Sequence, residues 1–211
     1  MLENLSFSYC ENISQFSITA RKLCSLTIKG CFSSELHKSI RLNLDLKSIS
    51  TLDLDNWSLQ YIMGETATTG LPPQLHALNV EFLKLSEFSF QNDVGTAAFV
   101  RLLCICPKLC KLEICFLWEE DIKGIDATSE QLNQLRAVVR TYERLLNLTF
   151  SSFRGFQSQM LFMKDMLECL PALENVVIIG DHMYDNFKEN EIIEEVLSFP
   201  LASAKSKIVY Y

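Results

Sequence analysis

The cysteines between residues 104 and 115 are the first residues of this sequence that suggest chemistry. Cys104 and Cys106 are separated by one residue, and Cys110 and Cys115 follow. Structural zinc sites favour cysteine pairs with about two to four intervening residues that return to a second pair. Here the first pair lies at the end of an expected helix, whereas Cys110 and Cys115 lie on an expected strand. We therefore interpret all four as packing residues and predict no metal site.

Catalysis by histidine is the next possibility. The three histidines, His37, His76 and His182, are scattered along the chain. Asp181 and His182 could form an acid–base pair, but adjacent side chains in an exposed loop rarely converge. The sequence contains no G-x-S-x-G, H-E-x-x-H or phosphate-binding glycine loop, and only seven glycines in total. We predict no enzyme activity, no catalytic residue and no cofactor.

The amino-acid composition limits the classes of binding partner and the cellular compartment that we expect. The 211 residues carry a formal net charge of −7, which argues against a nucleic-acid partner bound through phosphates. The apolar stretches are too short or interrupted to span a bilayer, and no signal peptide is visible at the N-terminus. In a reducing compartment cysteine behaves as a small buried apolar residue, so we expect a cytoplasmic or nuclear protein.

Four N-x-S/T sequons leave a secreted alternative open. They begin at Asn4, Asn12, Asn56 and Asn147. Such sequons accept N-linked glycans in secreted proteins. The alternative is a secreted or receptor-type binding fragment, and a glycosidase that leaves the mobility of the protein unchanged would remove it.

The pattern L-x-x-L-x-L organises the whole chain. It recurs seven times at intervals of 21 to 36 residues, beginning at Leu2, Leu23, Ile49, Leu75, Leu109, Leu145 and Leu173. Leucine-rich repeats are about 20–29 residues long and place one strand per repeat along the inside of a horseshoe. The pattern therefore predicts an α/β fold, namely a curved leucine-rich-repeat solenoid with its strands on the concave face.

The segments between these strands differ in the two halves of the chain. Residues 13–18 and 40–46 alternate apolar and polar residues. This alternation predicts that the outer side of the solenoid consists of irregular structure or short strands in the first half of the chain. Residues 96–106 and 157–170 have helical apolar spacing, and each precedes a proline that cannot continue a helix. Thr128 and Gln131 form a capping box that predicts a further helix in the second half.

Residues 142–211 resemble the FBD domain of plant F-box/FBD/LRR-repeat proteins. The matching elements are a strand followed by Phe153-Arg154-Gly155, a helix to Leu170, and Pro171-x-Leu173-Glu174 before the next strand. Phe199-Pro200-x-Ala202-Ser203 and a terminal strand over residues 208–211 complete the match. Leu201 departs from the family, which usually has arginine after the Phe-Pro pair. The expected domains are repeats over 1–141 and a continuous FBD unit over 142–211.

The resemblance implies a role in substrate recognition. Members of this family carry an F-box that docks the adaptor of a cullin–RING ubiquitin ligase, and their repeats select the protein to be ubiquitinated. From the position of the first repeat at Leu2, we expect that the sequence starts within the repeats and lacks the F-box. We therefore expect it to bind a protein partner, but to reach the ligase adaptor only if an F-box lies upstream in the full-length protein.

The concave face is the candidate binding site. Positions three, five and seven of each repeat should face the hollow of the solenoid. In the middle repeats these positions predict a charged patch, formed by Asp53, Asp55, Glu81, Lys111 and Glu113. Such a mainly acidic patch would attract a basic partner, although exposed strand positions can be charged simply for solubility. Nearer the C-terminus, Val177 and Ile179 are apolar, and we expect the C-terminal segment to cover them.

Overall fold

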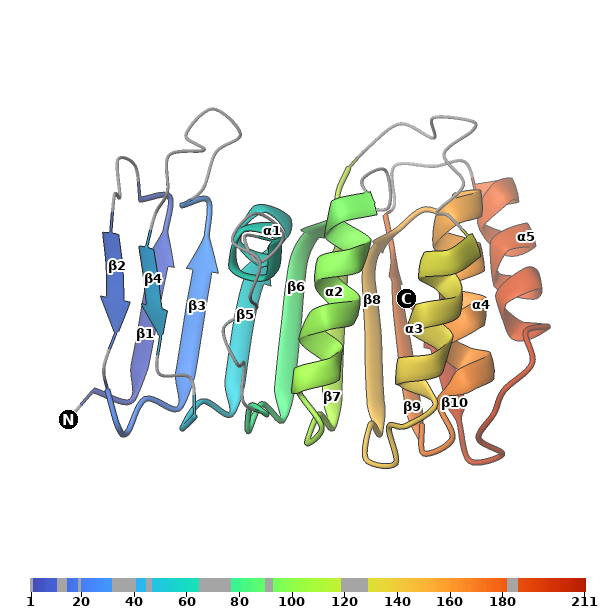
Figure 1. Cartoon of the computed structure of the whole chain (residues 1–211). Helices are drawn as coiled ribbons and strands as arrows, with labels where there is room; N and C mark the ends of the chain where they lie inside the picture. The colour runs from blue at the N-terminus through green and yellow to red at the C-terminus, as the bar shows by residue number, and fades with distance from the viewer. Residues whose placement is uncertain are drawn as a thin grey trace.

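The computed structural model describes residues 2–10, 15–18, 20–31, 41–44, 47–64, 77–89, 93–118, 129–181 and 186–211. In this part of the chain the protein has an α/β fold built on one eight-stranded parallel sheet, with helices between successive strands of its second half (Figure 1). The order of the strands in the sheet follows their order in the chain, and the sheet does not close on itself.

The strands are short and regularly spaced. The main sheet contains β1 (Asn4–Ser8), β3 (Ser25–Lys29), β5 (Thr51–Asp55), β6 (Phe82–Phe88), β7 (Lys111–Phe116), β8 (Asn147–Phe153), β9 (Asn175–Gly180) and β10 (Lys207–Tyr210). A second parallel sheet pairs β2 (Gln15–Ile18) with β4 (Arg41–Leu44), within the two segments where short strands are expected. The terminal strand expected at the C-terminus is β10.

A continuous row of apolar side chains sets the register of the main sheet. The row contains Leu5, Leu26, Leu52, Leu83, Leu112, Leu148, Val176 and Ile208, each opposite the next across a strand pair. Because side chains alternate between the two faces of a strand, this register places one apolar face against the core along the whole sheet.

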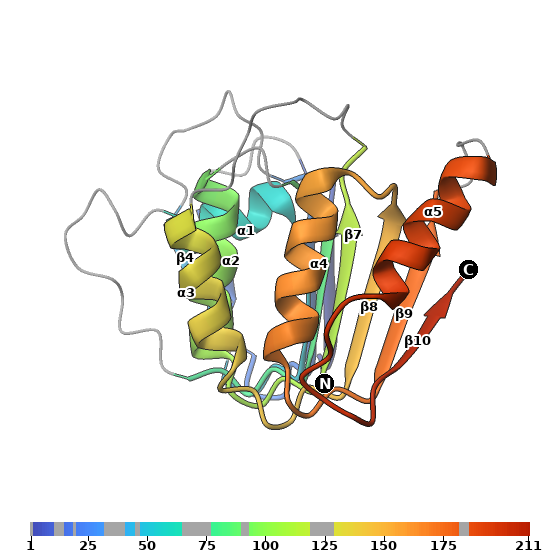
Figure 2. The same cartoon turned by 90° about the vertical axis from the view of Figure 1, so that its right-hand side faces the viewer.

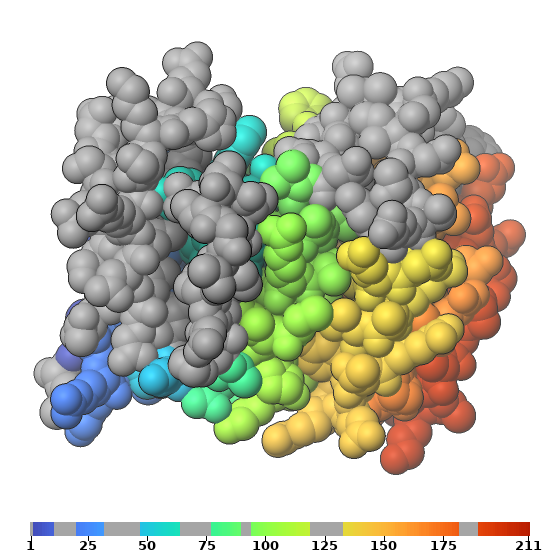
Figure 3. Space-filling view, in the orientation of Figure 1, coloured from blue at the N-terminus to red at the C-terminus, as the bar shows by residue number. Residues whose placement is uncertain are grey.

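Five helices accompany the strands of the described chain. They are α1 (Asn56–Gly64), α2 (Asp93–Ile105), α3 (Ser129–Val139), α4 (Gln157–Cys169) and α5 (Asn186–Leu197). Helices α1 to α4 lie on one face of the sheet, as Figure 2 shows from the C-terminal end. Figure 3 shows the outer surfaces of α2 and α3 on this helix-covered side. The part of the chain that the structure describes holds no helix with the length and apolar character needed to cross a membrane.

The two helices expected before Pro107 and Pro171 are confirmed as α2 and α4. The helix expected in residues 129–142 is α3, and Leu135, Val139 and Tyr142 are buried as its apolar stripe requires. The Tyr142 hydroxyl donates a hydrogen bond to the Leu103 carbonyl oxygen at 2.6 Å, which joins the end of α3 to α2. The expected N-cap, Thr128, lies outside the described residues.

Two sequence predictions about the first half are wrong. The expected strand in the repeat beginning at Leu75 does not form: residues 77–80 carry no strand, and the strand is β6, which starts at Phe82. The repeat unit in this region is therefore Val80-x-x-Leu83-x-Leu85, and its leucines pair with Leu52 and Leu54. The second error is α1, a helix after β5 where only irregular structure or short strands are expected.

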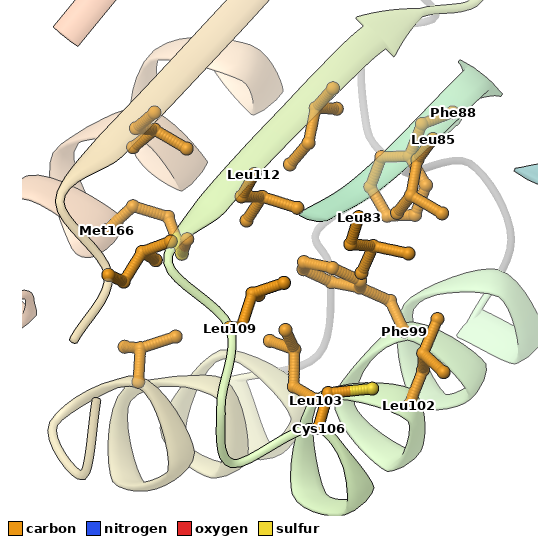
Figure 4. Close-up of a cluster of buried hydrophobic side chains, with 14 of the residues drawn as sticks. Leu83, Leu85, Phe88, Phe99, Leu102, Leu103, Cys106, Leu109, Leu112 and Met166 are labelled. Carbon is orange, nitrogen blue, oxygen red and sulfur yellow. The ribbon is translucent and has the colours of Figure 1, made fainter. Parts of the chain in front are cut away.

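A cluster of phenylalanines fills the core between the sheet and the helices of the second half. Its members are Phe88, Phe99, Phe116, Phe150, Phe153 and Phe162, all 3% exposed or less. Phe88 and Phe99 meet edge to face at 5.3 Å, and Phe116 stacks on Phe150 at 5.8 Å. In Figure 4, Leu83 and Leu112 point from the strands toward Phe99 and the leucines of α2.

Strands β6 and β8 contain the same irregularity. Glu87 and Ser152 have positive φ angles of 54° each, and the strand register shifts at these positions. A left-handed residue lets the next side chain turn back toward the core, so Phe88 and Phe153 are both buried. The main sheet and the apolar core both include residues from before and after residue 141, because β7 pairs with β8. The boundary between residues 141 and 142 thus stays a sequence-based prediction.

Gly155 provides a test of the packing at the C-terminal end. Its φ is +71°, and a Cβ added there would lie 2.5 Å from Cδ1 of Ile192 on α5. We expect Gly155→Ala to lower the free energy of unfolding by about 1–3 kcal/mol, because it adds left-handed strain and a steric overlap. In an Ile192→Ala background the same change should cost less, since only the backbone strain remains. Equal costs in the two backgrounds, measured by urea denaturation, would contradict this packing.

Candidate functional site

Among the described residues, no helix lies on the face of the main sheet opposite α1 to α4, and we call it the open face. Its central row contains Ser6, Thr27, Asp53, Lys84, Glu113, Thr149, Val177 and Val209, one residue from each strand. These side chains alternate with the buried leucines and are half-buried or exposed. The open face is therefore lined mainly by polar side chains, with valines on its last two strands, and an apolar layer lies beneath it.

Opposite charges alternate along the middle of this row. Asp53 pairs with Lys29 of the neighbouring strand, with Nζ 2.7 Å from Oδ2. Glu113 forms ion pairs with two lysines. The Nζ atom of Lys111 lies 2.8 Å from one of its carboxylate oxygens, and the Nζ atom of Lys84 lies 3.6 Å from the other. The expected acidic patch is thus a network of three lysines and two carboxylates. Exposed ion pairs of this kind contribute about 1 kcal/mol or less each to stability, so this network adds little to the stability of the sheet.

Phe82 adds an aromatic contact to this network. It occupies the start of β6 opposite Lys111, whose ammonium nitrogen lies 4.5 Å from the centre of the ring. A lysine held over an aromatic face is favourable electrostatically and limits the motion of the side chain. Lys84 and Phe82 were both missed by sequence analysis because the repeat in this region was assigned to residues 75–80.

Asp55 does not belong to the open face. Its side chain is buried, with 3% of the residue exposed. Oδ1 accepts a hydrogen bond from the Ser58 N–H at 2.7 Å, and Oδ2 accepts one from the Gly30 N–H. Asp55 therefore caps the first turn of α1 and ties it to the end of β3. The prediction that it faces a partner is corrected for this reason.

Glu81 is also displaced from its expected place. It lies in the bend before β6, and its side chain is exposed there. Its carbonyl oxygen accepts hydrogen bonds from the Cys110 and Lys111 N–H groups, at 2.9 and 3.0 Å. Of the five predicted residues, Asp53, Lys111 and Glu113 therefore share the open face, Glu81 lies at its edge, and Asp55 is inside.

The open face becomes apolar toward the C-terminus. The prediction that the C-terminal segment covers Val177 and Ile179 is wrong, because β10 instead pairs beside β9 and extends the sheet. Ile179 stays 40% exposed, and β10 adds Val209 and Tyr211, both exposed, at the same end. Strand β10 cannot fold over this face because its own inner side chains, Ile208 and Tyr210, pack against the core.

Arg154 joins the carboxyl ends of three neighbouring strands. Its guanidinium donates two hydrogen bonds to Oδ2 of Asp181, at 2.9 Å from Nε and 2.5 Å from Nη2. The ring of Trp118 lies over the guanidinium, 4.9 Å from its carbon to the ring centre, and 70% of this residue is exposed. Arg154 itself is the central residue of the Phe-Arg-Gly segment noted in the sequence. Its role explains that segment: Phe153 enters the core, Arg154 fixes Asp181, and Gly155 allows the turn.

The cysteines are free thiols at all eight positions. Burial raises the pKa of the Cys106 thiol to about 12, so this residue stays protonated and packs as an apolar side chain. Among the described residues there is no group of three or more histidine, cysteine or acidic side chains that could hold a metal. All three histidines lie outside the described residues, and Asp181, suggested as one half of an acid–base pair, is bound to Arg154.

Two of the four sequons are constrained by their neighbours. Asn56 is 7% exposed at the start of α1, and Asn147 accepts a hydrogen bond from Asn175 at 3.0 Å. A glycan on Asn56 would require this end of α1 to open. Asn4 lies on β1 with an exposed side chain, and Asn12 lies outside the described residues.

The chain was compared with protein-family models, curated proteins and solved structures. No protein-family model matches the chain, and neither a curated protein nor a solved structure does.

Proposed function

We propose that this chain is a protein-interaction module whose binding site is the open face of its sheet. The supporting observation is that this face carries an ordered array of charged and aromatic side chains, while the opposite face is used for packing. Lys84, Lys111 and Glu113 are positioned by neighbouring strands and by one another. A surface on which charges are held in fixed places suits recognition of a folded protein or an extended segment.

The proposed architecture is a leucine-rich-repeat solenoid with its strands on the concave side, closed by a unit that resembles the FBD domain. Two observations support it. The strands follow chain order across the sheet, and each contributes the same apolar positions of the L-x-x-L-x-L pattern. Repeat proteins stack similar units in this way, so that each unit contacts mainly its neighbours.

Within this proposal the chain selects the target of a cullin–RING ubiquitin ligase, as the resemblance to F-box/FBD/LRR-repeat proteins implies. The proposal includes no catalytic step, no cofactor and no nucleic-acid partner, and the net charge of −7 supports the last of these. It places the protein in the cytoplasm or nucleus, where its free thiols would stay reduced. The ligase adaptor would bind only through an F-box upstream of this sequence.

The partner of the mixed-charge network is a protein whose own surface carries both signs of charge. This differs from the basic partner that an acidic patch would attract, because Asp53 and Glu113 are each neutralised by a lysine. A partner would have to match the alternation of charge along the strands rather than the net charge of the protein.

The experiment is affinity capture from an extract with two charge-reversal variants. Lys84→Glu changes the open face, and Arg140→Glu makes the same change in net charge at the end of α3, where the side chain is exposed. We expect the proteins captured by the wild type to be lost from the Lys84 variant and kept by the Arg140 variant, as measured by quantitative mass spectrometry. Both variants should melt within a few degrees of the wild type. Loss from the Arg140 variant alone would move the binding site to the helices and overturn the proposal.

A further inference from the structure

Strands β1 and β3 end with the same local geometry. Ser8 and Lys29 are their last paired residues, and the Tyr9 N–H continues the pairing by donating to the Lys29 carbonyl oxygen at 2.8 Å. The next residues, Tyr9 and Gly30, both adopt left-handed backbone angles, with φ of 53° and 60°. Because both chains turn in the same way at matching positions, the residues that follow also match. Those residues are Cys10 and Cys31.

The two thiols are oriented alike at the matching ends of β1 and β3. Each lies against the carbonyl oxygen two residues earlier in its own strand, at 3.7 Å for Cys10 and 3.2 Å for Cys31. Cys10 is also among the groups that influence the pKa of the Cys31 thiol, as expected for neighbouring side chains. Matching residues on neighbouring strands lie about 4.8 Å apart, and disulfide-bonded cysteines have Cα atoms roughly 4.4–6.8 Å apart. A pair of residues at this general strand spacing falls within the range that a disulfide needs.

No other strand cysteine has this arrangement. Ser25 pairs with Thr51, and Cys24 lies one residue before Ser25. The residue beside Cys24 is therefore Ser50, which lies just before β5. Cys115 lies opposite Ser151 on β8. The match between Cys10 and Cys31 follows from the repeat itself, since both occupy the same position of their L-x-x-L-x-L units.

We propose that Cys10 and Cys31 form a redox modification site that a low-molecular-weight disulfide such as oxidised glutathione converts to an intramolecular disulfide. The Cys10 thiolate attacks one sulfur of glutathione disulfide, the S–S bond breaks, and one glutathione leaves and takes up the proton that Cys10 released. The Cys31 thiolate then attacks the Cys10 sulfur of the mixed disulfide, and the second glutathione leaves in the same way. Two protein thiols are oxidised while one glutathione disulfide is reduced to two thiols.

The order of attack follows from exposure. Cys10 is half-buried, whereas Cys31 is 8% exposed, so Cys10 meets the external disulfide first. Burial is also the main cause that raises the pKa of the Cys31 thiol. Since the thiolate is the attacking species, the second step should accelerate as the pH rises toward that pKa.

Closure of this bond would secure an edge strand of the sheet. Strand β1 pairs only with β3 in the described chain, and its inward residues Leu5 and Phe7 are only partly buried. A bond to Cys31 would tie β1 to a strand whose inward leucine is fully buried. The redox state of this pair would therefore set how firmly β1 stays in the sheet.

The test uses the full chain with oxidised glutathione at mildly alkaline pH, followed by intact mass and a tryptic map without reduction. Cleavage after lysine and arginine places Cys10 in residues 1–21, Cys24 in 23–29 and Cys31 in 30–38, so the three cysteines are separated. We expect a protein lighter by about 2 Da and a crosslink between residues 1–21 and 30–38. The oxidised protein should melt about 5 °C higher than the reduced one.

Two variants and one further reagent make the result decisive. In Cys31→Ser, Cys10 should stop as the mixed disulfide with glutathione, whereas Cys24→Ser should close like the wild type. A trivalent arsenical, which bridges two close thiols without oxidation, should bind the wild type and Cys24→Ser but not Cys31→Ser. Circular dichroism of the three reduced proteins should coincide. A mixed disulfide that persists at Cys10 of the wild type, or a crosslink from Cys10 to Cys24 in equal yield, would overturn the proposal.

Discussion

Replacing Phe162 by alanine is expected to lower the free energy of unfolding by about 3–5 kcal/mol. The side chain is 1% exposed on α4. The centre of its ring lies 6.2 Å from the ring centre of Phe88 on β6, 6.1 Å from that of Phe99 on α2 and 6.2 Å from that of Phe150 on β8. Removing the ring loses its transfer from water and leaves a cavity among three other rings, which the rigid sheet cannot close.

The neighbouring residue Leu161 supplies a matched control. It lies on the outer side of the same helix and is 47% exposed. Leu161→Ala has almost no core to disturb and should cost about 1 kcal/mol or less. Urea denaturation of the two variants and the wild type, with equal slopes, measures both values. Similar losses for Phe162 and Leu161 would mean that α4 does not pack on the sheet as described.

The helices and the apolar row could be predicted because local sequence decides them. Proline after residues 106 and 170 ends a helix wherever the chain goes, and α2 and α4 both end before it. Strands with apolar residues at alternating positions need one buried face, so Leu26, Leu52 and Leu112 had to face the core. These features depend on the spacing of residues along the chain and not on the identity of the neighbouring strand.

The register of β6 could not be decided locally. The segments 75–80 and 80–85 both fit L-x-x-L-x-L, with Val80 shared between them. The structure uses the second because Leu83 and Leu85 then lie opposite Leu52 and Leu54, and Phe88 reaches the core. A shift of register changes the side chains that line a face, so this one error hid Lys84 and turned a mixed-charge network into an apparent acidic patch.

Helix α1 was missed although its sequence carries a signal. Asp55 is a favoured N-cap residue, and Leu59 and Met63 follow at helical spacing, both buried. Asp55 was instead assigned to the strand because it continues the alternation of Thr51 and Asp53. The same residue fits the end of a strand and the start of a helix, and only the N–H groups of Gly30 and Ser58, which both donate to its carboxylate, show which role it has.

The two aspartates at the end of β5 should therefore behave differently when truncated. Asp55→Ala is expected to lower the free energy of unfolding by about 2–4 kcal/mol, because it leaves the buried Ser58 N–H and the part-buried Gly30 N–H without their acceptor. Asp55→Asn keeps an acceptor oxygen and should lose less. Asp53→Ala removes only a partly exposed ion pair with Lys29 and should cost about 1 kcal/mol or less.

Urea denaturation of the three variants gives the ranking, and amide hydrogen exchange locates the effect. In Asp55→Ala the amides of Ser58 and Gly30 should lose protection, whereas those in the core of β7 should change only as global stability changes. If Asp53→Ala proves as costly as Asp55→Ala, the open face is needed for folding as well as for binding. An Asp53 variant would then be unsuitable for the capture experiment, since the loss of Asp53 would weaken capture by unfolding the sheet and not by removing a contact.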